Sequence, residues 1–171
     1  QSVHTTTALN QGPIGNSIAD FVLINGKAIV YEIKTELDTF DRLQGQLEDY
    51  YKAFDHVCVV SSESSSPRLL SELRDSPVGI CVLNKMNRIS NKIKKDPQRD
   101  ASKINHFSLF SLLRKREYEQ ILLTYYHELP TATAVFYYDE SFARFAGIPI
   151  DEAYVMVLRE LKKRNKVKEH D

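Results

Sequence analysis

The sequence is poor in cysteine and contains no long apolar run, and each absence excludes a class of protein. Only two cysteines occur among 171 residues, each inside an apolar run, so neither a disulfide-rich scaffold nor a cysteine-based zinc site is expected. Cys58 and Cys81 are instead predicted to be buried and reduced. No apolar run reaches the roughly 18 residues that span a bilayer, which favours a cytoplasmic protein without membrane contact.

The chain also lacks an excess of charge of either sign, because 23 lysines and arginines balance 23 aspartates and glutamates. Bulk attraction to nucleic acid is therefore absent, and any such binding must come from local basic patches. Two patches qualify, although either could be an ordinary solvated surface. The residues that we predict to contact nucleic acid are Lys92, Lys94, Lys95, Arg114, Lys115 and Arg116.

Strand-like and helix-like segments alternate over the first half of the chain. The expected elements are strands over 3–8, 17–24 and 28–34, a helix over 39–54, a strand over 56–60, a helix over 67–75 and a strand over 78–83. The strands at 17–24 and 28–34 are apolar at both parities, which is typical of strands covered on both faces. A hairpin followed by alternating helices and strands predicts an α/β fold with a mixed sheet.

The composition changes after residue 83. Residues 84–103 are polar and basic and are expected to form a long surface loop or insertion. The helices expected beyond it lie near 107–128, 139–146 and 150–165. The predicted organisation is an α/β core over 1–83, a basic loop over 84–103 and an all-helical region over 104–171.

Asp20, Glu32 and Lys34 are charged residues within two strand-like runs that are otherwise apolar. Charged side chains rarely occupy interior strands unless they are paired or bind a metal ion. Glu32 and Lys34 are two apart on one strand and therefore point to the same face. Asp20 reaches that face only if the hairpin loop has an odd number of residues, as in a three-residue turn over 24–26. A two-residue Asn-Gly turn would place it on the opposite face.

Two carboxylates on one face repel each other unless a cation neutralises them. Oxygen ligands with spare water positions suit Mg²⁺ or Mn²⁺. Such an ion can activate a bound water and hold a phosphate, while a neighbouring lysine orients the water or stabilises negative charge. The alternative is that the three charged residues form an exposed ion network that contributes little.

The hairpin with Asp20 and the Glu-Ile-Lys tripeptide at 32–34 resembles the active-site region of the PD-(D/E)xK nuclease superfamily. This superfamily includes restriction endonucleases and RecB-type exonuclease domains. Gln46 and Tyr50 resemble the Q-x-x-x-Y motif of the RecB-like branch, and the stretch looks like small bacterial and phage members of unsettled function. The resemblance covers roughly residues 15–83. It implies a restriction-endonuclease-like mixed β-sheet core flanked by helices, with an all-helical C-terminal extension.

The resemblance also implies a role for each residue of the motifs. The implied metal ligands are Asp20, Glu32 and the backbone carbonyl of Ile33. Lys34 is expected to activate water, and Gln46 and Tyr50 are expected to position Lys34 or the strand that is cut. The alternative for Gln46 and Tyr50 is that they share a helix face and simply pack against the sheet.

The sequence departs from the superfamily pattern at two places. Ala19 stands before Asp20, where proline is common, and no acidic residue occurs over 1–19, where many members place a helix with a glutamate. We therefore expect upstream residues to supply that helix, and a homodimer to cover exposed apolar sheet surface without it. The function expected is a Mg²⁺- or Mn²⁺-dependent nuclease that acts on DNA in preference to RNA. The alternative is an inert nuclease-like module that binds nucleic acid or a protein partner.

Overall fold

The computed structural model describes residues 6–34, 39–83, 86 and 89–164. The chain forms two compact units, 1–103 and 104–171, which are described separately. The strands of the first unit are β1 (Thr7–Ile14), β2 (Ser17–Asn25), β3 (Lys27–Lys34), β4 (Val57–Ser62), β5 (Gly79–Leu83) and β6 (Ile89–Lys95). Its helices are α1 (Leu43–Tyr51) and α2 (Ser66–Glu72).

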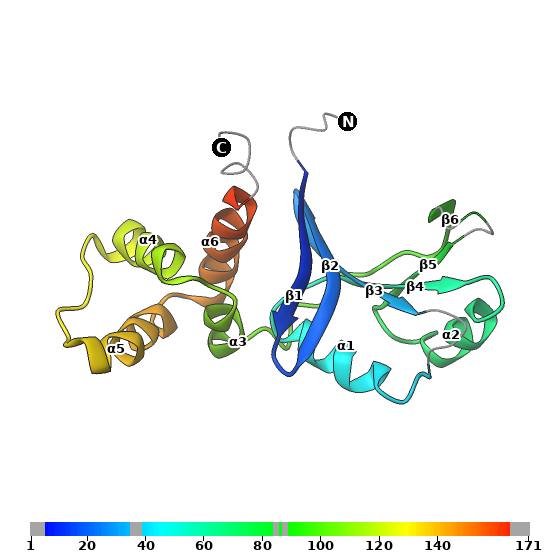
Figure 1. Ribbon diagram of the computed structural model, residues 1–171, viewed down its shortest axis with the longest axis horizontal. Helices are drawn as coiled ribbons and strands as arrows, with labels where there is room; N and C mark the ends of the chain where they lie inside the picture. The colour runs from blue at the N-terminus through cyan, green and yellow to red at the C-terminus, as the bar shows by residue number, and fades with distance from the viewer. Residues whose placement is uncertain (1–5, 35–38, 84–85, 87–88, 165–171) are drawn as a thin grey trace. The chain divides into compact units, whose positions relative to one another are not determined.

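The strands form one mixed sheet in the order β1-β2-β3-β4-β5-β6 (Figure 1). The pairs β1–β2, β2–β3 and β5–β6 are antiparallel, whereas β3–β4 and β4–β5 are parallel. Each parallel pair is joined by a helical crossover, α1 or α2, as parallel strands require. The predicted α/β fold with a mixed sheet is therefore confirmed.

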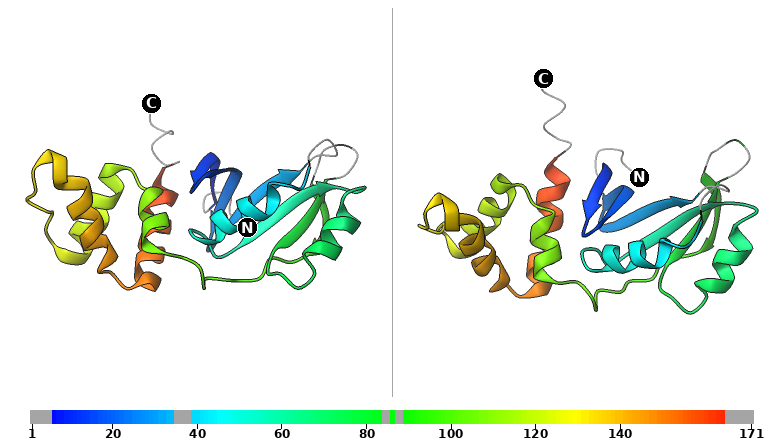
Figure 2. Two further views of the ribbon diagram at one scale, coloured as in Figure 1. Left: turned by 90° about the horizontal axis from the view of Figure 1, so that it is seen from below. Right: turned by 60° about the horizontal axis from the view of Figure 1, so that its bottom comes forward.

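The two crossover helices lie on one side of the strands (Figures 1 and 2). The even-numbered residues of β2 and β3 from Val22 to Lys34 are buried on that side, whereas the odd-numbered ones, such as Phe21 and Tyr31, are only half-buried. The rings of Phe21 and Tyr31 stack there with centroids 4.8 Å apart. The prediction that both faces are covered is thus confirmed for the side of the helices, whereas the other face is covered only in part.

The prediction of a loop over 84–103 is wrong for β6, which pairs antiparallel with β5. Ile89 pairs with Leu83 and Ile93 with Cys81, so these two isoleucines align with apolar residues of the neighbouring strand. The lysines around them hid this pattern, although lysine is common on edge strands because it blocks further pairing. The first strand is also shifted from the expected 3–8, because β1 spans Thr7–Ile14. It includes Pro13, which is tolerated because β1 is an edge strand.

The second unit contains four helices in the part of it that the structure describes. They are α3 (His106–Ser111), α4 (Lys115–Tyr126), α5 (Ala134–Ala146) and α6 (Ile150–Lys163). The single helix expected over 107–128 is therefore two helices, separated by residues 112–114. The ring of Phe110 packs against Tyr118, Phe142 and Phe145, with centroids 4.8–5.4 Å apart. No helix among the described residues is long and apolar enough to cross a membrane.

Candidate active site

The β2–β3 hairpin decides which way Asp20 points. Asn25 pairs with Lys27, so Gly26 alone forms the loop, and its φ of +72° is a left-handed conformation that glycine adopts without strain. The predicted odd loop length is confirmed, although the turn is tighter than a three-residue one. The same register pairs Phe21 with Tyr31, the last pair of the ladder, and places Asp20 directly beyond it, where its charge acts on Glu32.

Asp20 lies against the backbone of β3. Its Oδ2 accepts a hydrogen bond from the backbone N–H of Ile33 at 2.7 Å. In a strand, the N–H and C=O of one residue point to the same neighbouring strand. The carbonyl of Ile33 therefore points to the side of β3 on which Asp20 lies. This is the placement that a metal ligand at Ile33 would need.

Glu32 is a carboxylate in an unfavourable electrostatic position. Its side chain is almost fully buried, with 5% of the residue exposed. Burial raises the pKa of Glu32, and the charge of Asp20 raises it further, against the opposing effects of Tyr50 and Lys34. A divalent cation between Asp20 and Glu32 would remove this repulsion, so the pair has the donor chemistry of a magnesium or manganese site.

Gln46 of α1 connects Lys34 with Glu32. The ammonium of Lys34 donates to Gln46 Oε1 at 2.8 Å and lies 3.4 Å from Glu32 Oε1. The amide nitrogen of Gln46 in turn donates to Glu32 Oε1 at 3.0 Å. Lys34 is buried, so these contacts hold its ammonium in one place.

Tyr50, one helical turn after Gln46, holds the other oxygen of Glu32. Its hydroxyl donates to Glu32 Oε2 at 2.6 Å and lies 3.2 Å from the carbonyl oxygen of Ile18. Burial and the neighbouring Glu32 raise the pKa of Tyr50 well above its ordinary value, so the hydroxyl remains a proton donor. The structure thus brings Glu32, Lys34, Gln46 and Tyr50 into contact under α1, and Asp20 lies close enough for its charge to act on Glu32 and Tyr50.

One contact that supports the site had no signal in the sequence. Ser17 at the start of β2 donates from Oγ to Asp49 Oδ2 at 2.6 Å. Gly15 lies next to the carboxylate of Asp49, and a Cβ on Gly15 would be 3.2 Å from that carboxylate. Asp49 precedes Tyr50 on α1, so this contact ties α1 to the β1–β2 turn.

Comparison with known proteins identifies a family for the chain. Residues 2–167 match the family described as bacteriophage P4 protein cII. The chain belongs to this family. Protein cII of Enterobacteria phage P4 is 28% identical over 124 residues, which are 70% of this chain and 46% of that protein. The chain thus spans about half the length of this relative.

A solved protein of unknown function from Silicibacter pomeroyi is also similar. It is 11% identical, with a TM-score of 0.39 over 76% of this chain and 87% of that one. A similarity of this degree does not establish a shared fold.

The basic residues predicted to contact nucleic acid lie in both units. Lys94 is exposed near the end of β6. Lys92 lies on the same strand, and the structure does not describe the side chain of Lys92. The ammonium of Lys95 donates to the backbone carbonyls of Leu73 at 2.6 Å, of Val78 at 2.9 Å and of Ser76, and its role in nucleic-acid binding stays a prediction. A lysine used in this way stabilises the turn after α2, and burial lowers its pKa.

The remaining three predicted basic residues belong to the second unit. Arg114, Lys115 and Arg116 are exposed at the start of α4. The ammonium of Lys115 lies over the ring of Tyr137, 4.9 Å from its centroid. These side chains are available to an anion, and their role in nucleic-acid binding stays a prediction.

Proposed function

We propose that the first unit is a metal-dependent nuclease with a restriction-endonuclease-like core, which hydrolyses phosphodiester bonds in DNA in preference to RNA. The observation that supports it most is the hairpin, which places Asp20 against the backbone of Ile33 and near Glu32, with Lys34 beside Glu32. Gln46 and Tyr50 then hold Glu32 and Lys34 in one arrangement. A local sequence match could arise by chance, whereas this convergence of residues from three elements is a separate observation.

The proposed metal ligands are Asp20, Glu32 and the backbone carbonyl of Ile33, with water in the remaining positions. When bound, Mg²⁺ or Mn²⁺ would acidify a water molecule and neutralise charge on the phosphate. Carboxylate and carbonyl oxygens fit such an ion, and the raised pKa of Glu32 indicates that its negative charge is not fully compensated by the protein.

Lys34 has a separate proposed role, set by the number of its donors. An ammonium has three N–H groups. One is directed to Gln46 and one faces Glu32, and no contact with another described residue uses the third, which we assign to the attacking water or the scissile phosphate. In this arrangement Lys34 orients the water or stabilises negative charge on the phosphate, without having to move between two positions.

The test is a cleavage assay on the full chain. Single- and double-stranded DNA and RNA are incubated with Mn²⁺, with Mg²⁺ or with EDTA, and Lys34→Ala and Glu32→Ala proteins are purified in parallel. We expect cleavage that requires the metal, favours DNA, and is lost in both variants while their circular dichroism spectra are unchanged. Equal cleavage by all three proteins would show a contaminating nuclease and overturn the assignment.

The alternative is an inert nuclease-like module that binds nucleic acid or a protein. One observation favours it: both oxygens of Glu32 already have partners within the protein. Among the described residues there is also no group of three or more acidic, histidine or cysteine side chains that could hold a metal. Titration with Mn²⁺ separates the two functions, because the nuclease binds it through Asp20 and Glu32 and the inert module does not.

A further inference from the structure

The second unit contains a pocket between α4 and α6. It has a volume of about 360 Å³. The residues that line it include Ile121, Thr124, Met156, Arg159, Lys162 and Lys163. A volume in this range suits a group of the size of one nucleotide or one small ligand. It is too small for a whole peptide helix.

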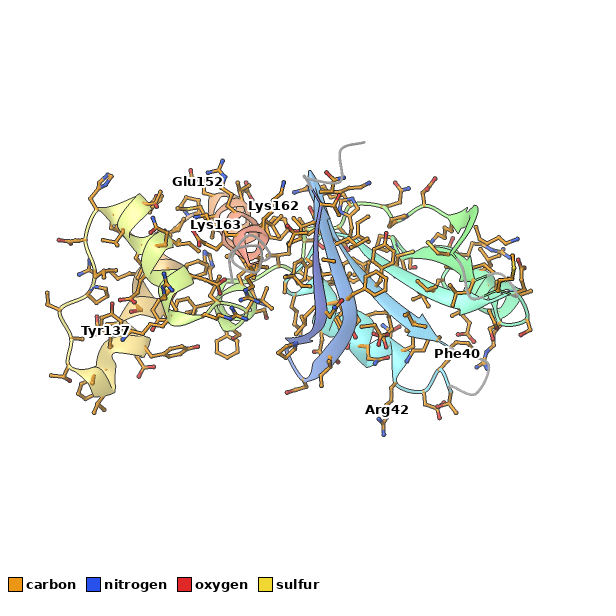
Figure 3. All side chains as sticks on the ribbon, turned by 45° about the horizontal axis from the view of Figure 1, so that its top comes forward. Phe40, Arg42, Tyr137, Glu152, Lys162 and Lys163 are labelled. Carbon is orange, nitrogen blue, oxygen red and sulfur yellow. The ribbon has the colours of Figure 1, made fainter. Side chains whose placement is uncertain are left out.

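The pocket combines an apolar floor with a cationic rim. The apolar part of the lining is Ile121, which is buried, and Met156, which is half-buried and supplies most of the apolar surface that a ligand could contact. Arg159 and Lys163 are both exposed on α6, and Figure 3 labels Lys163 beside Lys162 on that helix. An apolar floor under positive charges fits a ligand with a flat apolar group and an anionic group next to it.

One acidic residue faces these cations from within the pocket. Glu160 also lines it, and its Oε1 accepts a hydrogen bond from Lys163 at 2.7 Å. Arg159 and Lys163 against one carboxylate leave an excess of positive charge at the pocket. The lysines in the last turn of α6 also complement the helix dipole, and they thereby stabilise the helix. A loss of binding in lysine variants therefore has to be distinguished from a loss of stability.

A further cation, Arg116, lies on the same face of α4 as Thr124. Arg116, Gln120 and Thr124 follow one another at four-residue steps and therefore lie along one face of that helix. The side chain of Gln120 lies within 3.3 Å of the Thr124 hydroxyl, and Arg116 is exposed. An anionic chain that enters the pocket beside Thr124 would therefore meet a further cation on the same helix face.

We propose that this pocket binds one nucleotide of a single-stranded nucleic acid, with the base against Ile121 and Met156 and the flanking phosphates on Arg159 and Lys163. A base can enter such a pocket only when it is unpaired, which is why the proposal specifies a single strand. The inference rests on the proposed function in one respect, since it gives the nuclease a second contact with its substrate.

The test measures binding of a fluorescent 20-nucleotide single-stranded DNA and of the matching duplex to the full chain, in EDTA, by anisotropy over a range of salt. Arg159→Gln with Lys163→Gln should weaken single-strand binding. The salt slope should fall by about 1.4, because each phosphate contact to a single strand accounts for about 0.7. Thr124→Leu leaves the charge unchanged and adds bulk to the pocket lining without an aromatic ring on which a base could stack, and it should weaken single-strand binding by about tenfold while duplex binding changes little.

Arg144→Gln is the matched control, because Arg144 pairs with Glu128 outside the pocket and its removal should leave binding unchanged. Melting temperatures of all variants show whether a loss of binding is merely a loss of folding. Unchanged single-strand binding in Thr124→Leu would overturn the proposal, since a charged surface alone would then explain the affinity. Absence of any single-strand binding by the wild type would overturn it as well.

Failure of this inference and failure of the proposed function give different results. If the wild type cleaves with Mn²⁺ but the pocket variants bind as it does, the pocket inference is wrong and the nuclease stands. If the wild type binds a single strand through the pocket but does not cleave with any metal, the nuclease is wrong and the pocket inference stands.

Discussion

Gln46 accepts a hydrogen bond from Lys34 and thereby fixes the ammonium beside Glu32. The distance from Lys34 Nζ to Gln46 Oε1 is 2.8 Å, and the amide group of Gln46 donates to Glu32 at 3.0 Å. A single amide thus satisfies both partners of a buried ion pair, because its oxygen faces the cation and its nitrogen faces the anion. We infer that Gln46 is a positioning residue, and its contribution can be measured.

Gln46→Leu should lower the rate of metal-dependent cleavage by about 10- to 100-fold, the usual cost of losing a residue that orients a metal-site ligand. The loss should appear in kcat rather than in KM, since Gln46 holds Lys34 and not the substrate. Gln44→Leu is the matched control on the same helix, because Gln44 is exposed and hydrogen-bonds only to Glu48 among the described residues. Similar kinetics for the two variants would show that Gln46 only packs against the sheet.

Tyr50→Phe should destabilise the protein by about 1 kcal/mol, because Glu32 Oε2 loses its donor. The same change should raise the pKa of Glu32 further, so the acid limb of the cleavage profile should move to higher pH. Tyr51→Phe is the control, since its buried hydroxyl has no hydrogen-bond partner in the described part of the chain. Urea denaturation and a pH–rate profile test both effects. A profile that does not move would separate Tyr50 from the chemistry.

Glu32→Gln should make the protein more stable at neutral pH while abolishing cleavage. Burial raises the pKa of Glu32 in the folded state, so the native protein binds the proton more tightly than the unfolded chain does. The ionised side chain of Glu32 therefore destabilises the native state above that pKa. The resulting difference in the free energy of unfolding between variant and wild type should vanish as the pH falls below the ordinary carboxyl pKa. Melting temperatures across this range test it, and a less stable variant at pH 7 contradicts it.

Mn²⁺ should stabilise the wild type but not the Glu32→Gln protein. A ligand that binds only the native state raises stability by mass action, by about 2.7 kcal/mol at 100 times its dissociation constant. The measurement is the melting temperature with increasing Mn²⁺, and Ca²⁺ serves as a second oxygen-seeking ion. Equal shifts in both proteins would place the metal elsewhere on the chain.

Glu117 in the second unit should behave in the opposite way with pH. Burial opposes its ionisation, but hydrogen bonds from Arg164 at 2.6 and 2.8 Å and from the backbone N–H of Arg114 outweigh burial and lower its pKa. The stability that ionised Glu117 gives the folded protein is therefore present above the ordinary carboxyl pKa. It is lost as the pH falls through the lowered pKa of Glu117 in the folded state. Glu117→Ala should cost about 3 kcal/mol because it leaves Arg164 unpaired. The exposed pair Arg144–Glu128 is the control, and its loss should cost less than about 1 kcal/mol.

The hairpin and the charged residues on it could be predicted from the sequence, because the information is local. The two-residue spacing of Glu32 and Lys34 fixes their common face, and the parity of the loop fixes that of Asp20. What the sequence left open was the loop length. The structure resolves it through Gly26, whose positive φ allows a tighter turn than the expected one.

The parts that could not be predicted depend on contacts between distant residues. Lys95 looks like any other lysine of a basic run, and only the turn after α2 shows that its ammonium is needed by Leu73 and Val78. The pairing of β6 depends on β5, and the contact of Ser17 with Asp49 joins residues 32 apart in the chain. No periodicity reports such contacts, so the two edge strands and this support of the site emerge only from the fold.

The most direct test of the central claim is the conversion of supercoiled circular DNA to nicked and linear forms by the wild type and the Asp20→Asn protein, purified side by side, in Mn²⁺. Asp20 is the residue whose position depended on the hairpin, and asparagine preserves its size while removing the charge. The account predicts nicking by the wild type that EDTA abolishes and that Asp20→Asn reduces at least about 100-fold, as expected for a group that holds the reacting centre. No nicking by the wild type, or equal nicking by the two proteins, would contradict it.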